Sequence, residues 1–144
     1  MLIRRPIPEV FQAFVDPDVI TKFWFTESTG PLGPNAHVTW TWSMYGVSSE
    51  VRVREFEENR GFRISWGEDD PTEVEWTFTD LGPDKTFVAI RNHGFVGSPE
   101  EQVAAALDAT GGFCWVLAGA KAWLEHGIEL QLTGDRFPPE IGHS

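Results

Sequence analysis

Aromatic side chains at regular spacing are the residues of this sequence best suited to holding a small molecule. Pockets for small molecules are mostly apolar and aromatic, with a few polar groups that orient the ligand. Alternating aromatic residues are also the ordinary core of a β-sheet, so the set predicts either a pocket wall or a packed core. The candidates are Trp40, Trp42, Trp66, Trp76 and Phe78 on predicted strands and Phe113 on a predicted helix.

Asn92 and His93 end the last predicted strand, where a polar group could orient a bound ligand. Alternation puts them on opposite faces, so at most one points inward. The remaining histidines, His37, His126 and His143, fall in a loop, at a helix end and in the C-terminal tail. No spacing of His, Cys and Asp matches a zinc site. We therefore expect no metal and no cofactor.

The motifs of common catalytic sites are missing from the sequence. There is no Gly-x-Ser-x-Gly nucleophile motif, no GxGxxG pattern and no phosphate-binding loop. The acidic turn Glu68-Asp69-Asp70 lacks the pattern of a calcium loop and is interpreted as a solvated turn. No catalytic residue is assigned, although an enzyme that only shapes a cavity around a reactive substrate would need no such motif.

A helix over residues 112–127 is expected to carry Phe113. Its apolar positions form a single stripe: Phe113, Val116, Leu117, Ala120, Trp123 and Leu124. Gly127 is placed to end the helix. Cys114, the single cysteine, rules out an internal disulfide and is expected to be a small buried hydrophobe. Gly111-Gly112 is expected to separate this helix from a shorter one over 99–108.

The strands that would carry the other aromatic residues are predicted from alternating patterns. They cover 37–44, 47–57, 62–66, 73–79 and 85–92, after a short extended start over 1–5. Two short helices follow that start, the second capped by Asp16 with Pro17 at its first position, and residues 26–37 are expected to be a loop. Tight turns and polar alternate positions indicate an antiparallel sheet with one covered face. A long helix packed on that sheet satisfies both apolar surfaces, which makes the fold class α+β.

Length and charge limit the classes of partner. The 144 residues suggest one domain, with a core over about 3–127 and a surface tail over 128–144. The net charge of −11 argues against nucleic acid and against an anionic membrane surface. No signal peptide is recognised and we expect no apolar run long enough to span a bilayer, so we expect a cytoplasmic protein that does not bind membranes. The assembly state stays open, with a homodimer among the alternatives.

Several short motifs give the chain a resemblance to a known family. They are Pro8-Glu9-Val10-Phe11-Gln12-Ala13-Phe14 followed by Asp16-Pro17, then Phe23-Trp24, Thr86-Phe87-Val88, Asn92-His93-Gly94-Phe95, and Gly112-Phe113 with Leu117, Lys121, Leu124, Glu125 and Gly127. Together they resemble the START-like, helix-grip (SRPBCC) superfamily. The nearest branch is the AHSA type, similar to the C-terminal domain of the heat-shock-protein-90 ATPase activator. This branch usually has Gly-Trp where the present chain has Gly112-Phe113.

The resemblance implies a curved antiparallel sheet wrapped around a long C-terminal helix, with two short helices after the first strand. It also implies a deep apolar cavity between helix and sheet, since members bind lipids, hormones or polyketides and some are cyclases or other enzymes. The leading hypothesis is a protein that binds a small apolar or aromatic molecule in that cavity. The alternatives are a cyclase- or hydrolase-like enzyme using the same cavity, and a co-chaperone-like interaction module with a filled core.

Overall fold

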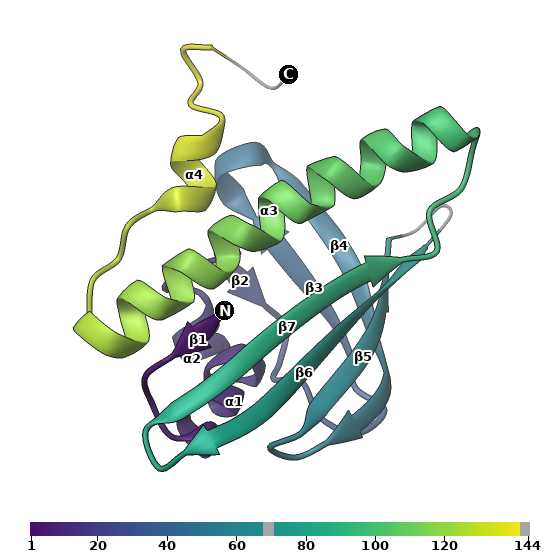
Figure 1. Ribbon diagram of the computed structural model, residues 1–144. Coiled ribbons are helices and arrows are strands. Elements are labelled where there is room, and N and C mark those ends of the chain that lie inside the picture. Colours follow the sequence, from purple (N-terminus) through teal and green to yellow (C-terminus); the bar gives the residue numbers. More distant parts are fainter. Residues whose placement is uncertain (68–70, 142–144) are drawn as a thin grey trace.

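The computed structural model describes residues 1–67 and 71–141 and has an α+β architecture in which one curved sheet holds a long helix (Figure 1). The acidic turn Glu68-Asp69-Asp70 lies outside the described residues. In chain order the elements are β1 (Leu2–Ile3), α1 (Ile7–Val15), α2 (Pro17–Ile20), β2 (Glu27–Ser28), β3 (His37–Trp42), η1 (Ser43–Tyr45), β4 (Val47–Glu57), β5 (Gly61–Trp66), β6 (Thr72–Gly82), β7 (Lys85–His93), α3 (Pro99–His126) and α4 (Leu132–Arg136).

The sheet is antiparallel throughout, with seven strands in the order β1-β7-β6-β5-β4-β3-β2. The predicted strand over 47–57 is confirmed as β4, and the other long strands agree with their predicted ranges to within a few residues. The buried side chains alternate along each strand, for example Val51 and Val53 in β4. These residues face the core, whereas the polar alternate positions face solvent.

The helix α3 is longer than predicted, because Gly111 and Gly112 continue it instead of breaking it. It starts at Ser98, whose side chain accepts a hydrogen bond from the Glu101 backbone N–H. It ends at Gly127 in the left-handed conformation, as predicted. Its C-terminal half packs closely on the core, whereas Val103 and Leu107 in its N-terminal half are 59% and 69% exposed.

The helices α1 and α2 fill one end of the concave face of the sheet (Figure 1). In α1, Phe11 and Phe14 meet the ring of Phe78 edge to face, with centroid distances of 5.0 and 5.8 Å. The predicted start of α2 is confirmed: the Asp16 side chain accepts from the Asp18 backbone N–H, and Pro17 occupies the first turn. The aromatic pairs therefore close the core at this end.

Local predictions fail where a short element is held by tertiary pairing. Residues 26–37 contain the strand β2, which pairs Ser28 with Trp40. Met44 does not continue the inward face of β3, because the chain turns into η1 after Trp42 and leaves Met44 exposed. The tail forms α4 and packs back on the molecule, with the Phe137 ring 6.4 Å from that of Tyr45.

Two predictions about α3 are also wrong. Cys114 is exposed, because it lies on the side of the helix away from the stripe that carries Phe113 and Val116. The second wrong prediction is that no apolar run is long enough to span a bilayer. By length and composition alone, α3 is long and apolar enough to do so. The predicted helix was shorter because it was cut at Gly111-Gly112. The core helix of a water-soluble protein meets the same criterion of length and composition.

Candidate functional site

A cavity of about 620 Å³ lies under the N-terminal half of α3, between that helix, the ends of strands β3 to β7, and the tail. Pockets that hold small molecules are usually about 300–1,000 Å³ in volume, so the cavity is of suitable size. The described lining is Trp24, Trp42, Tyr45, Val47, Ser48, Ser49, Trp66, Gly67, Thr72, Asn92, Phe95, Ala105, Asp108, Ala109, Gly112, Phe113, Trp115, Val116, Thr133, Arg136 and Phe137.

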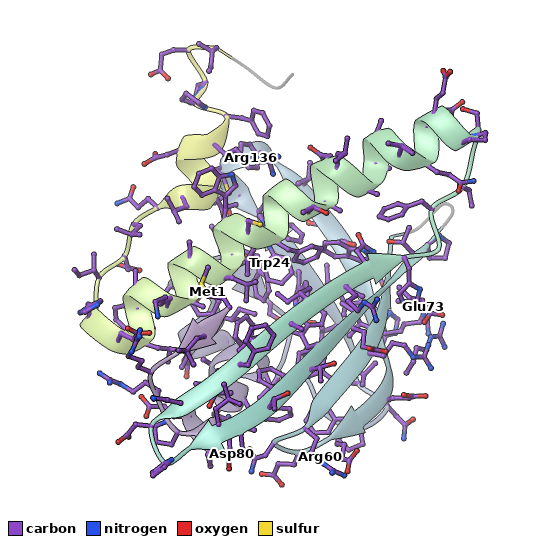
Figure 2. The ribbon with its side chains drawn as sticks, viewed as in Figure 1. Met1, Trp24, Arg60, Glu73, Asp80 and Arg136 are labelled. Atoms are coloured by element: carbon purple, nitrogen blue, oxygen red, sulfur yellow. The ribbon has the colours of Figure 1, made fainter. Side chains whose placement is uncertain are left out.

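The floor of the cavity is a cluster of aromatic rings centred on Trp24, which lies beneath α3 in Figure 2. Its ring centroid is 5.9 Å from that of Trp42, 6.0 Å from Trp66 and 5.7 Å from Phe113. The Trp66 and Phe113 rings are 5.9 Å apart, so sheet and helix meet through aromatic contacts. Edge and tilted arrangements of this kind are favourable and hold each ring in place. The wall offered to a ligand is therefore rigid and apolar.

Thr72 fixes two of the lining side chains through its hydroxyl group. Trp66 Nε1 donates a hydrogen bond of 2.9 Å to Thr72 Oγ1, and Asn92 Nδ2 donates one of 3.0 Å to the same atom. Asn92 Nδ2 also donates to the Glu73 backbone carbonyl, at 2.7 Å. Because both bonds use the amide nitrogen, the orientation of the Asn92 amide is determined, and its oxygen is the acceptor that remains.

The predicted site residues divide into two groups. Trp42, Trp66, Asn92 and Phe113 line the cavity, although Phe113 is only 8% exposed. The other four predicted residues do not line the cavity. Trp40, Trp76 and Phe78 are buried in the core, and His93 is exposed at the surface.

Core packing explains the position of the buried group. Trp40 is 1% exposed and stacks on Phe25 with a centroid distance of 4.5 Å. Trp76 stacks on Phe62 at 4.7 Å. Both rings contact that of Trp24, at centroid distances of 5.1 Å for Trp40 and 6.1 Å for Trp76, so the segment after α2 covers them. Alternation along the strands identified which residues point inward, but it could not say which of them are covered by another aromatic residue.

The sequence analysis missed the tail and the residues that contact it. Arg136 and Phe137 reach the cavity from α4, and Tyr45 meets them from η1. A hydrophobic pattern gives no signal for α4, since it is short and contains Gly134. Trp24 was also missed as a site residue, and here the run Phe23-Trp24-Phe25 was a usable signal of an aromatic centre.

Hydrogen bonds hold the tail against the mouth of the cavity. The Tyr45 hydroxyl donates to the Thr133 carbonyl, and Arg136 Nη2 lies 3.3 Å from Asp108 Oδ1 on α3. The guanidinium group rests against the backbone of Gly111 and Gly112, where a Cβ atom would come within 3.2 and 3.1 Å of its terminal nitrogens. The two glycines that failed to break α3 therefore make room for Arg136. Figure 2 shows Arg136 where α4 meets α3.

Glu125 ties the other end of α3 to the first strand. Burial by itself would raise the pKa of the Glu125 carboxyl group, but hydrogen bonds from Lys121 Nζ and the Arg4 backbone N–H outweigh it and lower the pKa. Lys121 Nζ also donates to the Leu2 carbonyl at 2.8 Å. This network positions the helix over the sheet.

Two further observations concern the described part of the chain. It contains no group of three or more His, Cys, Asp or Glu residues that could hold a metal ion.

A second hollow, of about 910 Å³, lies at the opposite end of the sheet near Arg60 and Asp80, which Figure 2 labels. Its walls include charged residues of β4, β5 and β6, so it is the less suitable of the two for an apolar molecule.

Comparison with solved structures shows the same fold in several bacterial proteins. A protein from Staphylococcus saprophyticus is 24% identical, with a TM-score of 0.78 over 91% of this chain and 92% of that chain. A protein from Mesorhizobium loti is 16% identical, with a TM-score of 0.73 over 89% and 98%. The Aha1 dimer from Colwellia psychrerythraea is 16% identical, with a TM-score of 0.67 over 88% and 93%. At these identities the likeness shows the fold alone.

No curated protein matches the sequence. A family model does match, over residues 4–118, and its description is "Activator of Hsp90 ATPase homolog 1-like protein". The matched range includes α1, α2, the sheet from β2 to β7 and most of α3. Since this is most of the chain, and the helix-grip architecture agrees, the protein belongs to the Activator of Hsp90 ATPase homolog 1-like family within the SRPBCC superfamily.

Proposed function

We propose that this protein binds a small apolar or aromatic molecule in the cavity under α3. The observation that carries the proposal is the cavity of about 620 Å³ floored by Trp24, Trp42 and Trp66. Aromatic walls bind planar apolar groups through area burial and ring contacts. The net charge of −11 also favours a small molecule over nucleic acid, which would require many basic residues on one surface.

Binding without catalysis is favoured over the enzyme alternative by the chemistry of the walls. Among the described lining residues there is no histidine and no cysteine, and the one carboxylate, Asp108, is 77% exposed and paired with Arg136. General acid–base catalysis requires a group that can exchange a proton within hydrogen-bond reach of the reacting atom, and the hydroxyl group of the lining residue Tyr45 donates to the Thr133 carbonyl. The co-chaperone-like alternative was an interaction module with a filled core. A cavity of about 620 Å³ argues against a filled core.

The proposal is tested with N-phenyl-1-naphthylamine, an uncharged aromatic probe that becomes fluorescent in apolar surroundings. The wild-type protein is expected to bind one equivalent. Trp42→Ala removes a wall residue that is only partly buried, so we expect a stability loss of about 1–2 kcal/mol. Its affinity for the probe is expected to fall by about tenfold or more, from lost ring contacts and apolar area.

Trp40→Phe is the matched control, since Trp40 lies two residues away on the same strand but in the buried layer. This variant keeps an aromatic ring in the core and should bind the probe as the wild type does. If the wild type binds no probe, or if Trp42→Ala binds it as tightly as the wild type does, the cavity is not a binding site and the proposal is wrong.

A further inference from the structure

We propose that the ligand carries an oxyanion on its apolar or aromatic body, and that Arg136 binds this group at the mouth of the cavity. This inference rests on the function proposed above and adds the chemical class of the ligand. A carboxylate, a sulfonate and a phosphate share the relevant chemistry, because a guanidinium group can donate two parallel hydrogen bonds to any of them.

Arg136 is held at the mouth by a pair of glycines in α3 and by the ring of Phe137. Glycine is among the least favourable residues in a helix interior, yet α3 has two in succession at 111 and 112. The terminal nitrogens of Arg136 lie directly over them, and a Cβ atom at either position would make a short contact with the guanidinium group. The pair thus leaves room for the guanidinium group, whose Cζ atom lies 5.0 Å from the centroid of the Phe137 ring, and Gly112, Arg136 and Phe137 all line the cavity.

The guanidinium group has unused donors. It carries five N–H groups, and in the described part of the chain one of its nitrogens, Nη2, makes a hydrogen bond, to Asp108 Oδ1 at 3.3 Å. Asp108 is 77% exposed while Arg136 is 26% exposed. An ion pair with so exposed a carboxylate is weak and easily exchanged. A ligand oxyanion that approaches from the cavity side can therefore add to this bond or replace it.

The charges around the cavity favour an anion over a cation. Aromatic walls also suit cations, but a cation here would meet the positive charge of Arg136, and the single described lining carboxylate, Asp108, already faces that charge. The net charge of −11 opposes anions at long range. Salt at physiological strength screens exposed charges beyond roughly 8 Å. Inside the cavity the adjacent Arg136 therefore contributes more to the electrostatic potential than the distant acidic residues do, and it favours an anion.

The test compares two probes that share one skeleton. 8-Anilinonaphthalene-1-sulfonate is N-phenyl-1-naphthylamine with one added sulfonate group. We expect the wild-type protein to bind the sulfonate about tenfold more tightly than the uncharged probe, as charge-assisted hydrogen bonds allow. In Arg136→Gln this preference should disappear while the affinity for the uncharged probe stays within about twofold, because the apolar wall is unchanged.

Three further variants separate a specific contact from general attraction. Arg136→Lys should keep part of the preference, since it keeps the charge but loses the two-pronged donor. Asp108→Asn should strengthen sulfonate binding by up to about fivefold, because it removes the negative charge that competes for Arg136 in a weak surface pair. Arg60→Gln, at the opposite end of the sheet and 75% exposed, should change nothing.

The outcomes distinguish the two proposals. If neither probe binds, the proposed function itself fails. If the uncharged probe binds but the sulfonate binds no more tightly, or if Arg136→Gln keeps the preference, the cavity binds apolar molecules and Arg136 is not the group that recognises the ligand.

Discussion

Gly119 is a point of close approach between α3 and Phe23, and enlarging it to alanine is predicted to destabilise the protein. A Cβ atom at this position would lie 3.0 Å from Phe23 Cβ and 3.3 Å from the Phe23 carbonyl oxygen. Carbon atoms in good contact are roughly 3.5–4.0 Å apart. Phe23 cannot easily move away, because it is buried and its ring packs on Phe14 at 5.4 Å.

The expected magnitude follows from two opposing effects. Exchanging glycine for alanine inside a helix stabilises it by about 1 kcal/mol. Overpacking a close contact costs about 1–3 kcal/mol, since helix and turn must separate. The net result for Gly119→Ala is a loss of up to about 2 kcal/mol in the free energy of unfolding.

Gly111→Ala in the same helix provides the matched control. The nearest atom to its new Cβ would be Arg136 Nη2 at 3.2 Å, the far end of a flexible side chain. This variant should be stabilised by up to about 1 kcal/mol, because its neighbour can move. Helix propensity cancels between the two variants, so the difference in unfolding free energy measured in urea isolates the packing cost at Gly119. If both variants are stabilised equally, α3 does not pack against Phe23 as closely as the structure shows, and the prediction is wrong.

Two further predictions concern the C-terminal end of α3. Leu124→Ala should lower the free energy of unfolding by about 2 kcal/mol, the low end for a core leucine because this one is only partly buried; no measurable loss in urea would mean that the apolar stripe does not face the sheet. The lowered pKa of Glu125 means that its contribution to stability is present above the ordinary value of 4.5 and is lost as the pH falls through the folded-state pKa. Stability of Glu125→Gln should therefore decline less steeply below pH 4.5 than that of the wild type, as followed by thermal unfolding, with exposed Glu129→Gln as the control; equal slopes for the wild type and Glu125→Gln would contradict the network with Lys121 and Arg4.

The strands and the main helix could be predicted because their patterns are long. The alternation along β4 and the stripe that holds Phe113 and Val116 each extend over several turns or pairs, so local exceptions do not hide them. Short elements have no such redundancy. The strand β2 has two residues and exists because it pairs with β3, and α4 has five residues that are held by Tyr45 and Asp108.

Part of the cavity could be predicted and part could not. Trp42 and Trp66 were identified because they alternate with polar residues, and Asn92 because it ends a strand. The depth of each ring was not predictable, since Trp40 and Trp42 follow the same pattern and differ only in what covers them. Gly111-Gly112 was interpreted as a helix break because glycine usually weakens helices. Tertiary packing of Arg136 on the pair reverses that expectation.

The position of the cavity follows from the uneven size of the side chains along α3. Small residues such as Gly119 and Ala120 bring the C-terminal half of the helix down onto the core, where α1 and α2 fill the sheet. Toward the N-terminus the helix rests on the larger Phe113, and in the part of the chain that the structure describes no helix or strand fills the space beneath it. The tail closes that space from the side. Among the described lining residues the one basic side chain, Arg136, comes from α4, so the positive charge at the mouth is supplied by the tail and not by the sheet or by α3.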